Sequence, residues 1–77
     1  MLYQARYVKL REELAQARQQ AGMTQAELAK RMGKAQSYVS KVETGERYVE
    51  VLDFLRWCEM SGADAAHVLE RVQAARI

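Results

Sequence analysis

Apolar residues recur at spacings of three and four along most of the chain, which is the pattern of amphipathic helices. Capping and turn residues divide this pattern into five stretches. It predicts helices over residues 4–21, 25–32, 35–43, 50–60 and 64–75. The sequence contains no proline, and its four glycines lie at the ends of these stretches. We therefore predict that residues 1–77 form a single all-α domain.

The second predicted helix begins with a strong capping signal. Thr24 is a good N-cap, and Glu27 stands three residues later. In such a capping box, each side chain accepts a hydrogen bond from the backbone N–H of the other residue. Gly33 is placed to end the helix in the left-handed conformation. The predicted buried side of this helix comprises Leu28, Ala29 and Met32.

The third predicted helix has two distinct faces. The predicted buried face comprises Ala35, Tyr38, Val39 and Val42. The opposite face lacks acidic residues and comprises Gln36, Ser37, Ser40, Lys41 and Thr44. A helix with such a face can enter the major groove of DNA, where glutamine, serine and lysine side chains bond to base edges. For the helix taken alone, an ordinary solvated face is the alternative.

These two helices and the turn between them resemble the lambda-repressor-like helix-turn-helix family, also called Cro-type or XRE-type. The segments that carry the resemblance are TQAELAKRMG at residues 24–33 and QSYVSKVETG at residues 36–45, and the likeness extends from Leu10 to Leu69. It implies a compact bundle of five helices, with the helix-turn-helix at the second and third helices. It also implies an ion pair between Arg18 of the first helix and Glu43 of the third.

The resemblance favours DNA binding over a merely solvated face, with the third helix as the recognition helix. The residues expected to contact bases are Gln36, Ser37, Ser40 and Lys41. The residues expected to contact phosphates are Gln25, Lys34, Tyr38 and Arg47. In the family, the position of Gln25 lies against the DNA backbone, where the positive end of a helix also attracts phosphate.

Charge is distributed unevenly along the chain. The net charge of +2 does not by itself indicate a nucleic-acid partner. Residues 1–35 hold seven basic and three acidic residues, whereas residues 48–77 hold three basic and five acidic ones. The positive half contains the second helix and the turn, where phosphates would lie. We expect the negative half to face away from DNA or toward a partner.

The fourth predicted helix carries more apolar residues than one buried face needs. Its predicted core face comprises Val51, Phe54, Leu55 and Cys58. Trp57 and Met60 fall outside this face, which leaves two interpretations of equal weight. Either the C-terminal helix covers them through Val68, Val72 and Ile77, or they form the centre of a dimer interface, where Trp and Met are enriched.

The first predicted helix is longer than the resemblance requires. Its core face is expected to comprise Tyr7, Leu10, Leu14, Ala17 and Ala21. Residues 1–9 precede the usual start of the family domain, so we interpret them as an N-terminal extension of this helix.

Several classes of protein are excluded by what the sequence lacks. It has no Gly-rich phosphate loop, no paired catalytic carboxylates and no Cys–His or Ser–His arrangement, so we expect neither an enzyme nor catalytic residues. His67 stands alone, and we expect no metal site, no cofactor and no small-molecule ligand. The single cysteine, Cys58, cannot form an internal disulfide and suits a reducing cytoplasm. No leader or long apolar run is present, so we expect no membrane association.

The sequence thus predicts a sequence-specific DNA-binding transcriptional regulator in the cytoplasm, associated with the nucleoid. The resemblance implies a repressor of prophage, plasmid or antitoxin type. Its expected partners are double-stranded DNA with a pseudo-palindromic operator and a second copy of the chain in a homodimer. The alternative is a protein-interaction adaptor that keeps the helix-turn-helix fold with weak or no DNA binding. The polar face of the third helix favours the regulator.

Overall fold

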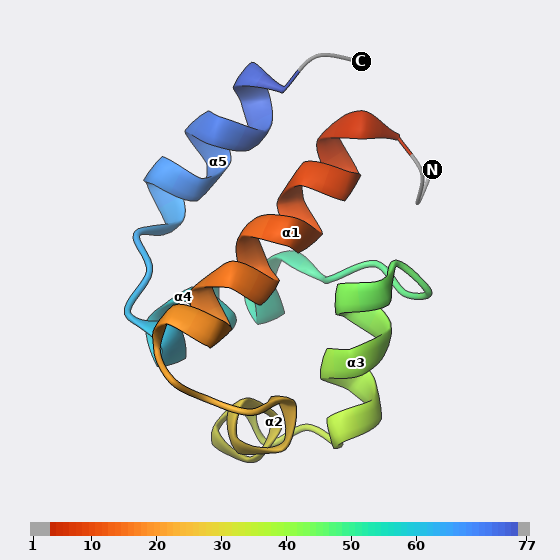
Figure 1. Cartoon of the computed structure of the whole chain (residues 1–77), viewed down its shortest axis with the longest axis vertical. Helices are drawn as coiled ribbons and strands as arrows, with labels where there is room; N and C mark the ends of the chain where they lie inside the picture. The colour runs from red at the N-terminus through yellow and green to blue at the C-terminus, as the bar shows by residue number, and fades with distance from the viewer. Residues whose placement is uncertain (1–3, 76–77) are drawn as a thin grey trace.

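The computed structural model describes residues 4–75 of the chain (Figure 1). This part of the chain contains five helices and no strand, as predicted. They are α1 (Ala5–Gln20), α2 (Gln25–Met32), α3 (Gln36–Thr44), α4 (Val51–Ser61) and α5 (Ala65–Ala74). Each helix end lies within one residue of its predicted position. Within these residues, no helix has the length and apolar character needed to cross a membrane.

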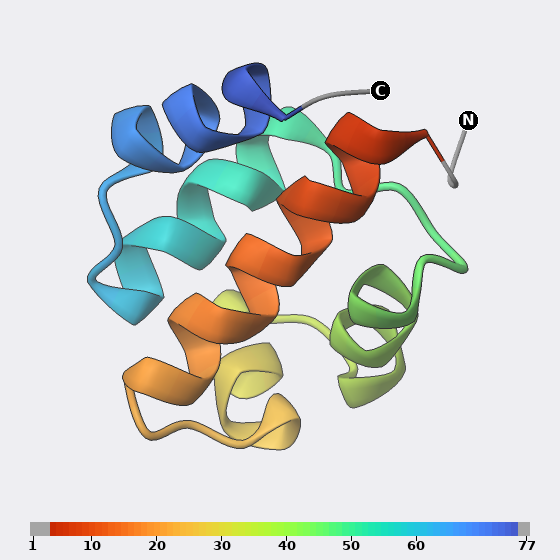
Figure 2. The same cartoon turned by 45° about the horizontal axis from the view of Figure 1, so that its top comes forward.

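Helix α1 occupies the middle of the molecule and organises the other helices around it. It packs against α3, α4 and α5, while α2 packs against α3 and α4. Figures 1 and 2 show α5 alongside α1 and the pair α2 and α3 at the opposite end of the fold. The fully buried side chains at the centre are Leu14, Leu28, Val39, Val42, Trp57, Cys58 and Val68. The α2–α3 pair is therefore supported by a single core that all five helices share.

Apolar burial along α1 is less continuous than predicted. Leu14 is fully buried, whereas Tyr7, Leu10 and Ala17 are only half-buried. Ala21 follows the end of the helix and is exposed. The side of α1 that faces α5 instead buries a carboxylate. Glu13 is 6% exposed and contacts two cations.

The Glu13 carboxylate joins α1 to α5. Its oxygens lie 2.9 Å from Arg71 Nε and 3.2 Å from Lys9 Nζ. Burial favours the neutral acid, but the hydrogen bonds and charges of Arg71 and Lys9 outweigh it and lower the pKa of Glu13. A charged residue thus takes a place in the α1–α5 contact that the apolar pattern did not reveal.

The buried side of α4 differs from the predicted one. Trp57 is fully buried, and its indole N–H donates a 2.9 Å hydrogen bond to the Leu14 carbonyl. Val51 and Leu55 were predicted for the core, yet they are 68% and 43% exposed. Helix α4 contacts α1, α2 and α5, so its buried surface is broader than the single stripe expected of a helix packed on one side.

This burial corrects the predicted dimer interface. Trp57 has no surface left for a partner, so the interface interpretation is wrong for this residue. Met60 is half-buried and packs against the same core. Val68 and Val72 of α5 also pack there, as the intramolecular interpretation expected, whereas Ile77 lies outside the described residues.

An ion pair fixes α3 against α1, as the resemblance implied. Arg18 Nε and Nη2 donate to the two carboxylate oxygens of Glu43 at 2.7 and 3.1 Å. Arg18 Nη1 also donates to the Met23 carbonyl at 2.8 Å. This geometry is a bidentate pair, in which both direction and distance are constrained. The predicted pair is confirmed, and it joins the last turn of α3 to α1.

Helix α1 also holds the C-terminal end of α3. Gly45 follows this helix with φ +85°, a conformation that favours glycine. Arg11 Nη1 donates to the Thr44 carbonyl at 2.8 Å. The guanidinium lies so close to Gly45 that a Cβ atom there would overlap it. The missing side chain of Gly45 is thus what gives Arg11 access to the end of the helix.

Candidate nucleic-acid interface

The turn between α2 and α3 is built from local signals. The Thr24 hydroxyl accepts from the Glu27 N–H at 3.1 Å, and the Glu27 carboxylate accepts from the Thr24 N–H at 2.8 Å. This is the predicted capping box. Gly33 then ends α2 with φ +70°, and the Lys34 N–H returns to the Ala29 carbonyl at 2.8 Å. The short, closed turn brings α3 directly against α2.

Helix α3 lies at the edge of the fold (Figure 1), and the side chains on one of its sides are buried. Tyr38, Val39 and Val42 are buried as predicted. Ala35 is not, because it is the N-cap rather than part of the helix and it is exposed. Its methyl group cannot accept from the first N–H groups of α3, so these carry no side-chain cap.

The four predicted base-contacting residues share the outward side of α3. Gln36, Ser37 and Lys41 are exposed, and Ser40 is half-buried. The structure therefore brings them onto one surface, and at its C-terminal end the Thr44 hydroxyl donates to the Glu46 carboxylate at 3.0 Å. A helix surface of this chemistry can donate to and accept from base edges in a major groove.

Tyr38 lies at the centre of a charged cluster beside this surface. Its hydroxyl donates a 2.6 Å hydrogen bond to Asp53 Oδ2 on α4. Lys34 Nζ lies 3.2 Å from the same oxygen and 4.9 Å from the centre of the tyrosine ring. Arg47 Cζ lies 4.7 Å from that ring centre. Both predicted phosphate-contacting cations thus lie against one aromatic ring.

The predicted phosphate contact of Tyr38 needs correction. The side chain is 7% exposed and its hydroxyl proton is already donated to a carboxylate. Burial and the bond to Asp53 raise the pKa of Tyr38, while that same bond lowers the pKa of Asp53. Tyr38 therefore supports Lys34 and Arg47 and is not a free donor.

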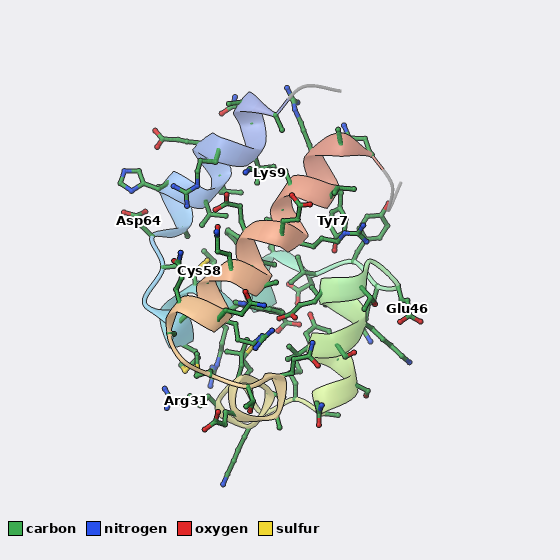
Figure 3. All side chains as sticks on the ribbon, viewed as in Figure 1. Tyr7, Lys9, Arg31, Glu46, Cys58 and Asp64 are labelled. Atoms are coloured by element: carbon green, nitrogen blue, oxygen red, sulfur yellow. The ribbon has the colours of Figure 1, made fainter. Side chains whose placement is uncertain are left out.

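Gln25 also has an internal partner. Its side-chain Nε2 donates to Glu43 Oε1 at 3.0 Å, and the residue is half-buried. Gln25 therefore extends the ion pair that holds α3, and only the remaining amide hydrogen is available to a phosphate. The exposed cations on α2 are Lys30 and Arg31, and Figure 3 shows Arg31 on the outer side of this helix.

Asp53 is the main residue of the cluster that the sequence did not indicate. It lies in the first turn of α4, where an acidic residue is expected simply to complement the helix dipole. Its contacts with Lys34 and Tyr38 span 19 and 15 residues of sequence. Only the packing of α4 against α2 and the adjacent α3 brings these residues together.

Comparison with known proteins agrees with this geometry. Residues 9–70 match a family model described as a helix-turn-helix domain. A solved structure described as an XRE-family like protein from Pseudomonas syringae pv. tomato str. DC3000 is similar, with a TM-score of 0.84 and 44% sequence identity. The likeness covers 91% of this chain and 85% of that chain. No curated protein sequence matches the chain. The chain therefore belongs to the XRE family of helix-turn-helix proteins, which are DNA-binding transcription regulators.

Proposed function

We propose that the protein is a sequence-specific repressor, of prophage, plasmid or antitoxin type, that acts at the nucleoid by occupying its operator. The observation that carries this proposal is the outward surface of α3. Gln36, Ser37, Ser40 and Lys41 lie together there, and the exposed cations Lys34 and Arg47 flank them. Occupancy needs no effector domain, and a bound protein on an operator blocks access by polymerase.

Base reading and phosphate binding fall to different residues. Gln36 begins α3 and can form two hydrogen bonds with adenine, while Lys41 lies farther along the same face and suits guanine. Lys34 and Arg47 precede and follow the helix in sequence, and both lie against the Tyr38 ring, so they can bind neighbouring phosphates on one side of the groove. The uncapped N–H groups at the start of α3 add a further attraction for phosphate.

We propose that the protein binds DNA as a homodimer on a pseudo-palindromic site. Val51, Leu52 and Leu55 form an exposed apolar surface on the first turns of α4, with Val51 and Leu52 67–68% exposed. This surface takes the place of Trp57 and Met60 as the candidate interface. It lies on α4, the helix that follows the recognition helix, so a second copy docked there would fix the spacing between two recognition helices. Helix-turn-helix dimers place these helices about 34 Å apart, which is one turn of DNA.

The base-reading proposal is tested by selecting bound sequences from a random pool of duplexes. Gln36→Ala should lose about 1–3 kcal/mol of discrimination at one base step. Gln19→Ala, at an exposed glutamine near the end of α1, is the matched control and should leave the selected motif unchanged. Lys34→Ala should weaken specific and random duplexes alike and reduce the salt dependence by about one unit. An unchanged motif in Gln36→Ala would refute the assignment of α3 to base reading.

The dimer is tested separately by sedimentation. Leu52→Glu should lower the dimer fraction and weaken binding to a two-half-site duplex more than to a single half-site. Leu69→Glu, at an exposed leucine of α5, is the control for an added charge. If the wild type binds no duplex at low salt, the repressor proposal fails, and the α4 surface would then favour the alternative of an adaptor that binds another protein.

A further inference from the structure

Helix α1 begins before the part of the chain that matches the family model. The match starts at residue 9, whereas α1 starts at Ala5. Tyr7 lies in this additional turn, and Figure 3 shows it beside the segment that connects α3 and α4. Its contacts therefore come from outside the residues that the family model matches.

The Tyr7 hydroxyl joins two backbone groups of the α3–α4 segment. It donates to the Arg47 carbonyl at 3.1 Å and accepts from the Val49 N–H at 2.8 Å. The ring also packs edge-on against Tyr48, with ring centres 4.7 Å apart and planes inclined at 77°. One side chain thus holds the backbone on both sides of Tyr48.

The protonation of Tyr7 suits this arrangement. Burial raises the pKa of Tyr7, so the hydroxyl remains a donor throughout the neutral range. The bond to the Arg47 carbonyl requires this proton, because a carbonyl oxygen can only accept.

The segment between α3 and α4 depends on such contacts for its shape. Residues 46–50 lie outside any helix. The Glu46 and Arg47 N–H groups bond back to the Lys41 carbonyl of α3 at 2.9 and 3.2 Å, whereas the Arg47 carbonyl and the Val49 N–H bond to Tyr7. The Arg47 backbone is held by Tyr7, while its guanidinium lies over the Tyr38 ring, close to Lys34. An arginine held in place in this way loses less conformational entropy when it binds a phosphate.

We propose that Tyr7 is a positioning residue for DNA binding: its hydroxyl holds the α3–α4 segment so that Arg47 is kept ready for a phosphate beside α3. This inference rests on the proposed DNA-binding function. The first turn of α1 then contributes to DNA binding through the α3–α4 segment.

The first test measures how far the Tyr7 hydroxyl holds the α3–α4 segment in the absence of DNA. Tyr7→Phe removes only the hydroxyl that makes both hydrogen bonds. Tyr48→Phe, which removes the hydroxyl of the ring packed against Tyr7, is the matched control. Amide hydrogen exchange at Val49 should become about twofold to tenfold faster in Tyr7→Phe and stay unchanged in Tyr48→Phe. Helical circular dichroism should be that of the wild type in both variants.

The second test uses a random-sequence duplex of 30 base pairs at several salt concentrations. Tyr7→Phe should bind it about twofold to tenfold more weakly, with a salt slope reduced by up to about 0.9. In an Arg47→Ala background, adding Tyr7→Phe should cause no further loss of binding but should still speed exchange at Val49. This dependence on Arg47 is not expected of a residue that only stabilises the fold.

The outcomes are distinguishable. Faster Val49 exchange with unchanged DNA binding would overturn the positioning role, and so would an equal loss of binding with and without Arg47. An equal loss in Tyr48→Phe would also overturn it. If the wild type binds no duplex at low salt, the proposed function itself is refuted, and this inference falls with it.

Discussion

Replacing Arg18 by methionine should strongly destabilise the fold, because it leaves the Glu43 carboxylate buried without its cation. The side chains of Arg18 and Glu43 are 12% and 7% exposed. Both carboxylate oxygens accept from Arg18, and one also accepts from Gln25. In the variant, Gln25 would be the remaining side-chain donor to this carboxylate within the described residues.

The magnitude follows from this burial. Removing one partner of a buried ion pair costs about 3–5 kcal/mol, and the lost hydrogen bond to the Met23 carbonyl adds about 1 kcal/mol. A domain of this length has a free energy of unfolding of about 4–12 kcal/mol. Since 1 kcal/mol corresponds to about 4–8 °C in a small domain, the Tm of Arg18→Met should fall by more than about 12 °C.

The assay is urea denaturation followed by far-ultraviolet circular dichroism. Arg18→Lys keeps the charge but loses the two parallel hydrogen bonds, so its stability should lie between those of Arg18→Met and the wild type. The double variant Arg18→Met with Glu43→Met removes both charges and should recover part of the loss. A loss below about 1 kcal/mol in Arg18→Met, or a double variant less stable than Arg18→Met, would refute this account.

Three further predictions concern groups buried in the core. Trp57→Ala should lose about 3–5 kcal/mol of unfolding free energy, and wild-type tryptophan emission should be that of a buried indole; an emission maximum typical of water would contradict the structure. The folded-state pKa of Glu13 is lowered by Arg71 and Lys9 against the effect of burial, so the wild type should exceed Glu13→Gln in stability at neutral pH. That advantage should vanish as the pH falls through the folded-state pKa of Glu13, and urea midpoints at pH 7 and pH 3 measure it. Burial raises the pKa of the Cys58 thiol, so a thiol reagent should label it slowly at neutral pH in the native protein and rapidly in urea; fast native labelling would count against its burial.

Local signals account for the parts of the fold that sequence reasoning predicted well. The capping box of Thr24 and Glu27 and the glycines after α2 and α3 act within a single turn of helix. Their effect does not depend on the rest of the chain. The outward face of α3 could be predicted for the same reason, since helical geometry alone places Gln36, Ser37 and Lys41 on one side.

The features that sequence reasoning missed depend on the arrangement of the helices. The face of α4 was misplaced because three helices cover it, and a single apolar stripe describes a helix covered from one side. The role of Tyr38 was misread because Asp53, its partner, comes from α4. A polar side chain near a site can hydrogen-bond either to a ligand or to a neighbouring residue, and only the tertiary packing shows which partner it has.

The contact between Arg11 and Gly45 makes the anchoring of α3 depend on two distant positions of the chain. The C-terminal end of α3 carries a partial negative charge, and the Arg11 guanidinium meets it at the Thr44 carbonyl. Any side chain at position 45 would displace this cation, even an asparagine that tolerates the left-handed backbone. Because the guanidinium is the flexible end of a long side chain, it can move aside, and what the substitution removes is the hydrogen bond to the Thr44 carbonyl. Position 45 therefore decides whether Arg11 can hold the end of α3, although 34 residues separate the two positions in sequence.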